Sequence, residues 1–237
     1  MAYKRYKNKA GKVVPGVTTI TGRFKDSGAL IWWANQVGLG EHDACEGQPR
    51  CQKCGRRAGL NHRDAAQKAA DVGSLAHDLI EERVKKVTID WTEYSHLSEE
   101  QKDMAAECLV DFDRWFSTSE VEILETEIGL VSEKLQFGGR PDAIARVQGK
   151  LAILDWKTSR GLYSDYIAQV AGGYIILIEE SGMFGKVEEM HIIRVSKESG
   201  SFNHHSWRRS HLQPAIDYFL TARTLFDQAK ALEKMLK

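Results

Sequence analysis

Residues 138–159 read GGRPDAIARVQGKLAILDWKTS, and this stretch decides the fold that we predict for the chain. Apolar and β-branched residues dominate it, so we interpret it as two strands, residues 135–147 and 151–157. The three residues between them, Gln-Gly-Lys at 148–150, are typical of a turn, which makes the two strands a hairpin. The second strand opens with the apolar run Leu-Ala-Ile-Leu, as expected for a strand that is covered on both faces.

Three charged side chains lie near the ends of these strands: Asp142 on the first, and Asp155 and Lys157 on the second. Because side chains alternate along a strand, Asp155 and Lys157 point to one face of the sheet and Trp156 to the other. Two carboxylates in a covered position are costly unless something binds there. We therefore expect Asp142 and Asp155 to hold a divalent metal, with Lys157 facing the water or phosphate next to it.

A long helix is predicted from residue 61 or 62 to about residue 86, because small and apolar residues recur there at helical spacing. Gly73 and His77 are four residues apart and share one face of this helix. Gly73 lets the helix approach the sheet closely, which brings His77 over the carboxylates. Glu81 lies one turn further on, within reach of His77 or of a metal-bound water.

Four motifs in order resemble the RecB-like branch of the PD-(D/E)xK nuclease superfamily, which includes phage exonucleases and the mitochondrial genome maintenance exonuclease. That branch shows G-x-x-x-H on a helix, then G-x-x-D, D-x-K-T and Q-x-x-x-Y. This chain carries Gly73–His77, Gly139–Asp142, Asp155–Thr158, and Gln169 followed by Tyr174, which is one residue further than the pattern. The resemblance extends from about residue 14 to about residue 208.

The resemblance implies a restriction-endonuclease-like core with His77, Asp142, Asp155 and Lys157 as catalytic residues. In such relatives the two aspartates and the main-chain carbonyl at the position of Trp156 bind Mg²⁺ or Mn²⁺, and the histidine binds the metal or lies next to it. The lysine positions or deprotonates the attacking water, or neutralises the developing charge. We expect DNA contacts from the glutamine of the last motif and from nearby side chains: Gln169, Tyr174, Arg160 and Arg140.

Length and composition fit one soluble nuclease domain over residues 1–237, since 42% of the residues are apolar and 28% charged. No apolar run is long enough to span a bilayer, and the basic start of the chain lacks the apolar core of a secretory signal. These features predict a cytoplasmic protein, in the host cytoplasm if the chain is phage-encoded. A formal net charge of zero argues against a purely electrostatic coating of nucleic acid, although not against a nuclease.

Residues 40–63 have few apolar residues, and we predict a small zinc-binding insertion there. Cys51 and Cys54 are spaced like the thiolates of a zinc knuckle, and Gly55 after them permits a tight turn. Cys45 is the third expected ligand, and His62 or His42 the fourth. A disordered loop with incidental thiols and an iron–sulfur cluster are the alternatives, and the latter ranks lower because the relatives that carry one use cysteines far apart in sequence.

The remaining pattern predicts an α/β fold with a central mixed β-sheet flanked by helices. Glu125 and Glu127 lie in one of its strands, where one of them is able to reach the active site, although a solvated strand face explains them slightly better. The expected helices are residues 29–37, 98–116, 164–180 and 211–236, and the further strands are residues 121–131, 187–195 and 201–207.

These observations predict a metal-dependent deoxyribonuclease, with phage-type recombination, repair or DNA degradation as its setting by resemblance. The same resemblance favours an exonuclease that acts on linear single or double strands. Three alternatives stay open: a structure-specific endonuclease, a nuclease directed at RNA, and a non-catalytic DNA-binding or assembly protein that acts through the cysteine cluster. A recombination or replication protein is a possible partner.

Overall fold

The computed structural model describes residues 5–25, 28–43, 52–86, 88–195 and 201–236. Of residues 29, 38–43 and 52–65 it describes the helical backbone and not the side chains. A five-stranded sheet forms the centre, in the order β3-β6-β7-β8-β9. Neighbouring strands are antiparallel except β7 and β8, which are parallel, so the predicted mixed sheet is confirmed. The strands are β3 (Val121–Thr126), β6 (Ala143–Val147), β7 (Lys150–Lys157), β8 (Glu189–Val195) and β9 (Phe202–Arg208).

Strands β6 and β7 form the predicted hairpin. Its turn places Gln148 and Gly149 in the left-handed region, with φ of 51° and 79°, as tight two-residue hairpin turns require. Every residue of β7 except its two ends is buried, as expected of a strand covered on both faces. The register pairs Ala143 with Leu154 and thereby sets which residues meet at the far end of the hairpin.

Two strands are shorter than the sequence predicts. The strand predicted at residues 135–147 breaks at Arg140–Asp142, because Pro141 lacks the N–H that a continuous ladder needs. Its first part is β5 (Phe137–Gly139), which pairs with β4 (Leu130–Ser132) in a separate ribbon. The strand predicted at 121–131 divides into β3 and β4, since the chain turns at Glu127, whose φ is 53°.

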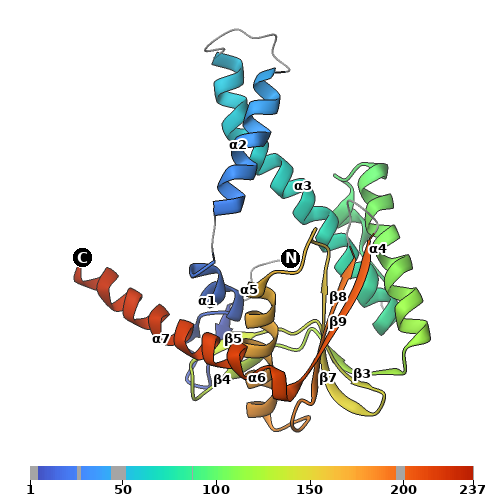
Figure 1. Cartoon of the computed structure of the whole chain (residues 1–237), viewed down its shortest axis with the longest axis vertical. Coiled ribbons are helices and arrows are strands. Elements are labelled where there is room, and N and C mark those ends of the chain that lie inside the picture. Colours follow the sequence, from blue (N-terminus) through green and yellow to red (C-terminus); the bar gives the residue numbers. More distant parts are fainter. Residues whose placement is uncertain (1–4, 26–27, 44–51, 87, 196–200, 237) are drawn as a thin grey trace.

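Helices cover both faces of the sheet (Figure 1). One face packs against α3 (Gln52–Lys85) and α4 (Glu99–Thr118), with Phe112, Trp156 and Ile193 in the shared core. The other face packs against the segment from α5 to α6 and against α7, with Ile153 and Phe219 in its core. The helices on that second side are α1 (Val17–Arg23), α5 (Ser164–Ile167), the π-helix η2 (Ala168–Tyr174), α6 (Ile175–Ser181) and α7 (Gln213–Met235).

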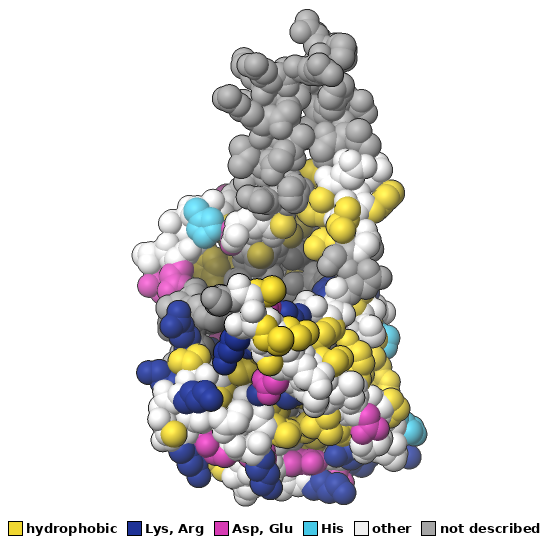
Figure 2. Space-filling view, turned by 90° about the vertical axis from the view of Figure 1, so that its left-hand side faces the viewer, with side chains coloured by type: hydrophobic (Ala, Val, Ile, Leu, Met, Phe, Trp, Pro, Cys, Tyr) yellow, Lys and Arg dark blue, Asp and Glu magenta, His cyan; other side chains and the backbone are white. Residues whose placement is uncertain are grey.

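A pair of helices projects from the body of the molecule (Figure 1). Helix α2 (Gly28–Asp43) packs along the first half of α3, and both are longer than predicted. Residues 52–61 belong to α3, so the tight turn predicted at Gly55 is wrong. Of the predicted insertion, residues 44–51 and the side chains of residues 40–43 and 52–63 lie outside the described part. Apolar side chains are exposed at the surface in Figure 2. Leu30, Ile31 and Trp32, near the start of α2, are exposed.

Smaller elements complete the described chain. A short ribbon of β1 (Tyr6–Lys7) and β2 (Val13–Val14) precedes α1, and two 3₁₀ turns, η1 (Trp91–Tyr94) and η3 (Arg209–His211), precede α4 and α7. Helix α4 begins with the predicted capping box between Ser98 and Gln101. Among the described helices, none combines the length and the apolar character that a membrane crossing needs.

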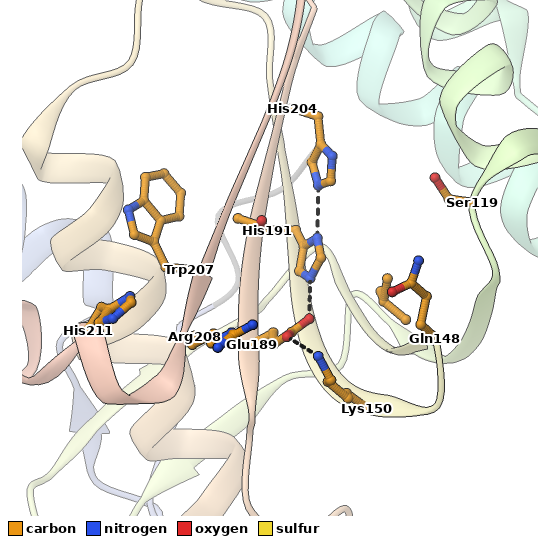
Figure 3. Close-up of a pocket in the computed structure, with 11 residues that line it drawn as sticks. Ser119, Gln148, Lys150, Glu189, His191, His204, Trp207, Arg208 and His211 are labelled. Carbon is orange, nitrogen blue, oxygen red and sulfur yellow. Dashed lines mark hydrogen bonds and ion pairs between the residues drawn. The ribbon is translucent and has the colours of Figure 1, made fainter.

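Four polar side chains form a continuous row at the hairpin-turn end of the sheet, beside a cavity of about 450 Å³ (Figure 3). Lys150 Nζ lies 2.6 Å from Glu189 Oε1, and Glu189 Oε2 lies 3.4 Å from His191 Nε2. The other ring nitrogen of His191 lies 2.8 Å from Nε2 of His204, whose ring contacts Trp115. Burial lowers the pKa of His191, and loss of hydration together with His191 lowers the pKa of His204 to about 4.

Gly172 should resist even the smallest added side chain. A Cβ there would lie 2.4 Å from Cβ of Phe219 and 2.6 Å from the carbonyl oxygen of Ala215 on α7. We expect Gly172→Ala to lower the free energy of unfolding by about 1–3 kcal/mol, measured by urea denaturation. Gly22→Ala is the matched control, because nothing lies within 4 Å of its Cβ position. Equal stability of the two variants would contradict the close packing of η2 on α7.

His204 should lower the stability of the protein as the pH is reduced from about 6.5 to about 4. In this range the unfolded chain protonates His204 at its ordinary pKa of 6.5, whereas the folded chain keeps it neutral, so acid favours unfolding. We expect the urea midpoint to fall more between pH 7 and pH 5 in the wild type than in His204→Gln. An identical fall in both proteins would rule out this histidine as a source of acid sensitivity.

Candidate active site

The register of the hairpin brings the two predicted aspartates together. Asp142 directly precedes β6 and Asp155 lies on β7, so both sit at the same end of two paired strands. Asp142 Oδ2 accepts a hydrogen bond of 2.9 Å from the main-chain N–H of Trp156, which fixes this carboxylate against β7. Both aspartates are buried, Asp155 completely. The fold therefore concentrates negative charge in a place with little water.

Lys157 lies on the same face as Asp155, and its Nζ is 2.6 Å from Oδ2 of that residue. Trp156 points to the opposite face and packs against Phe112, in agreement with the predicted alternation. Burial raises the pKa of Asp155 to about 6 although the ammonium of Lys157 works against this, and burial also raises the pKa of Asp142. One lysine thus offsets only part of the cost of holding two buried carboxylates.

His77 reaches the carboxylates from α3. Its Nδ1 is 3.9 Å from Oδ2 of Asp142, and its ring centre is 6.4 Å from that of Trp156. Burial, followed by the charge of Lys157, lowers the pKa of His77 to about 4. The imidazole is therefore neutral at pH 7, which is the form that binds a metal. Gly73, one turn earlier, is buried and lines the same cavity of about 410 Å³ as His77.

The chemistry of these side chains fits a divalent cation. Two carboxylates and a neutral imidazole are suitable donors for Mg²⁺ or Mn²⁺. Asp155 Oδ1 is buried and has no hydrogen-bond partner among the described residues, as expected of an oxygen reserved for a ligand. Within the described part of the chain, no group of three or more His, Cys, Asp or Glu side chains already stands in metal-holding geometry. The ammonium of Lys157 occupies one side of Asp155 instead.

The π-helix η2 compensates for the unusual spacing of Gln169 and Tyr174. A π-helix pairs residue i with i+5, one residue more than an α-helix, so these two side chains come to lie on one face. Gln169 Nε2 donates a hydrogen bond of 2.7 Å to the hydroxyl of Tyr174, which is buried. Gly139 makes room for the Tyr174 ring, since a Cβ at that position would lie 2.8 Å from Cε1 of the tyrosine.

The two arginines predicted to touch DNA have different surroundings. Arg140 Nη1 lies 3.0 Å from Glu127 Oε2, which leaves this guanidinium paired within the protein. Arg160 is exposed, and its main-chain carbonyl accepts a hydrogen bond from Arg194. The structure thus presents the side chain of Arg160 more openly than that of Arg140.

Two glutamates line the cavity beside His77. Glu127 lines it from the turn after β3, whereas Glu125 is exposed. A solvated strand face therefore describes Glu125, while Glu127 lies where it is able to reach the site. Burial and the nearby Asp142 raise the pKa of Glu127 to about 7. Glu81 lines the same cavity, but its carboxylate pairs with Lys85 at 2.6 Å rather than with His77.

Two features of the site escape the sequence reasoning. Arg194 is buried on β8, in register with Lys157, and donates hydrogen bonds of 2.9 Å to the carbonyls of Ser159 and Arg160. It thereby fixes the loop that follows Lys157. A charged residue inside the apolar run of β8 is the signal that was available. The second feature is Tyr166, whose ring lies under the ammonium of Lys157 at 5.1 Å.

The predicted zinc site remains untested. Cys45 and Cys51 lie outside the described residues, and the side chains of Cys54, His62 and His42 do as well. The remaining cysteine, Cys108, is buried in the core between α4 and the sheet.

The solved structures that resemble this chain include two of an alkaline exonuclease, LHK-Exo from Laribacter hongkongensis. Its complex with dAMP is 13% identical to this chain and gives a TM-score of 0.33. A second structure of this exonuclease is 14% identical and gives a TM-score of 0.31. Each match covers 73% of this chain and 93% of the other. A search of curated proteins gives no significant match.

Comparison with protein families is more decisive. The family model described as the PD-(D/E)XK nuclease superfamily matches residues 49–174. These residues make up more than half of the chain, and they contain α3 with His77, the hairpin with Asp142, Asp155 and Lys157, and the π-helix as far as Tyr174. The chain belongs to the PD-(D/E)XK nuclease superfamily.

Proposed function

We propose that this protein is a metal-dependent deoxyribonuclease that hydrolyses phosphodiester bonds from the ends of linear DNA. The observation that carries the proposal is the meeting of His77, Asp142, Asp155 and Lys157 at one end of the central hairpin. Family membership agrees with a nuclease, and the order of the four sequence motifs favours the RecB-like exonucleases within that family.

The metal would be held by Asp142, Asp155 and His77, with the main-chain carbonyl of Trp156 as a further ligand. When bound, Mg²⁺ or Mn²⁺ supplies a more acidic water and stabilises negative charge on the phosphate. Neutral His77 donates its lone pair without adding charge, and its nitrogen makes Mn²⁺ more acceptable than an all-oxygen site would. Asp155 Oδ1 has no hydrogen-bond partner in the described part of the chain, so this oxygen would bind a metal without giving up a protein contact.

Lys157 acts as a fixed positive charge next to the reacting phosphate. Burial lowers its pKa, but Asp155 and Asp142 more than offset this, so its pKa is raised and the side chain stays an ammonium. In this form it donates hydrogen bonds to the attacking water or to a phosphate oxygen and offsets the charge that develops there. Gln169 and Arg160 are the residues that we expect to hold the DNA backbone.

The strongest alternative is a DNA-binding or assembly protein that keeps the nuclease fold without its activity. Against it stands the fact that all four residues of the site are present and close together. An endonuclease would use the same chemistry and differ only in how DNA enters. A structural zinc ion at Cys45, Cys51, Cys54 and His62 and a cytoplasmic, phage-type setting stay predictions from the sequence.

Removal of either charged group on β7 should abolish cleavage. Asp155→Asn loses a metal-binding charge and Lys157→Ala loses the ammonium, so we expect cleavage rates to fall at least about a hundredfold in each variant. Circular dichroism and urea denaturation should find both variants folded. Arg146→Ala is a suitable control, because Arg146 is exposed on the hairpin and donates to the carbonyl of Gly149, away from Asp155. A folded variant that cleaves at the wild-type rate would refute the site assignment.

The proposed reaction predicts a dependence on both metal and DNA ends. We expect the protein to degrade linear single strands or duplexes in Mn²⁺ or Mg²⁺, to spare covalently closed circles, and to be inactive in EDTA. The measurement is gel analysis of end-labelled substrates, with Lys157→Ala as the inactive control. Cleavage of circles would identify an endonuclease. Binding of DNA without any cleavage would favour the non-catalytic alternative.

A further inference from the structure

A group of aromatic side chains leads from Lys157 to the surface of the protein. The ring of Tyr166 lies 5.1 Å from Lys157 Nζ, and the ring of Tyr163 meets that of Tyr166 edge-on at 5.4 Å. Tyr163 is 47% exposed, whereas Tyr166 is half-buried. The two rings therefore lie one after the other between the solvent and Lys157.

We propose that Tyr163 and Tyr166 form a stacking platform for unpaired nucleobases next to the scissile phosphate. The inference rests on the proposed function, and it deepens it by naming single-stranded nucleic acid, or a frayed end, as what the site binds. Bases in a duplex have their faces covered by their neighbours, so an aromatic platform selects bases that are unstacked. Duplex DNA would then reach the site only after its end has opened.

The ammonium of Lys25 lies over both rings of the platform. Lys25 Nζ lies 5.6 Å from the ring centre of Tyr163 and 5.8 Å from that of Tyr166, near the outer limit of a cation–π contact. The same ammonium is 2.8 Å from Asp165 Oδ2, and its side chain is 46% exposed. Lys25 thus lies over the two rings as an ion pair with Asp165, and the exposed part of Tyr163 is the surface that a base can reach.

The platform is held rigidly enough to act as a docking surface. Tyr163 follows the loop whose carbonyls, at Ser159 and Arg160, are fixed by buried Arg194. Tyr166 belongs to α5, which continues directly into η2 and the core. At Gly161 a Cβ would lie 3.7–4.0 Å from atoms of the Tyr163 ring, an ordinary van der Waals distance, so the ring lies against the loop at this residue. Ordinary packing does not require an exposed tyrosine at this position.

The test is the affinity of Tyr163 variants for oligonucleotides, measured by fluorescence anisotropy in Ca²⁺, with the oligonucleotide checked for cleavage on a gel. We expect Tyr163→Ala to bind a single-stranded 20-mer about five- to a hundredfold more weakly than the wild type. Tyr163→Phe and Tyr163→Trp keep a ring and should bind within about threefold of the wild type. On an oligonucleotide of the same length made of abasic residues, Tyr163→Ala and the wild type should bind alike, because no bases are left to stack.

Tyr218→Ala is the matched control, since Tyr218 lies on α7 and is equally exposed at 47%. Tyr163→Leu keeps the bulk without the ring, and it replaces the alanine variant if urea denaturation finds the latter unfolded. The proposal is wrong if a folded Tyr163→Ala or Tyr163→Leu variant binds the intact strand as tightly as the wild type does. It is also wrong if the substitution reduces the affinity for the abasic strand as much as the affinity for the intact strand. The nuclease proposal is tested separately: it fails if the wild-type protein cleaves no DNA in Mn²⁺ or Mg²⁺, whatever the binding of the Tyr163 variants.

Discussion

The pairing of β6 with β7 is the constraint on which the rest of the site depends. Because Ala143 lies opposite Leu154, the residue before β6 and the residue after Leu154 meet, and both are aspartates. The hydrogen bond from the main chain of Trp156 to Asp142 ties the first carboxylate to the strand that carries the second. A shift of one residue in this register would turn Asp155 toward the opposite face, so the tight turn at the other end of the hairpin also determines the site.

The π-helix η2 determines how Gln169 and Tyr174 lie relative to each other. One extra residue between Gln169 and Tyr174 would rotate the tyrosine about 100° away from the glutamine in a regular α-helix. The π-helical turn absorbs this residue, and the two side chains remain within 2.7 Å. The π-helix η2 also contains small residues, and one of them, Gly172, allows it to approach α7 closely. The π-helix thus keeps Gln169 and Tyr174 in hydrogen-bond contact, which a regular α-helix with the same spacing would not do.

Sequence periodicity was sufficient for the hairpin, the mixed sheet and the helix with His77, because each is specified by local patterns of apolar residues. The break at Pro141 and the turn at Glu127 were missed, since apolar residues lie on both sides of each and suggest one long strand. The helical extension of α3 over residues 52–61 was missed for the opposite reason: its composition is polar and suggested a loop. Contacts between distant elements, such as Tyr166 under Lys157, depend on how helices dock and have no local signal.

Lys157 and Arg194 lie side by side on parallel strands, and their different partners explain how two buried cations coexist. Arg194 directs its donors to neutral oxygens: the carbonyls of Ser159 and Arg160, and the side chains of Ser201 and Asn203. Because it pairs with no carboxylate among the described residues, both aspartates remain to interact with Lys157 and with an added cation. The arginine also holds the loop between β7 and the two tyrosines, so this one residue contributes both to the charge balance around Asp155 and to the position of Tyr163.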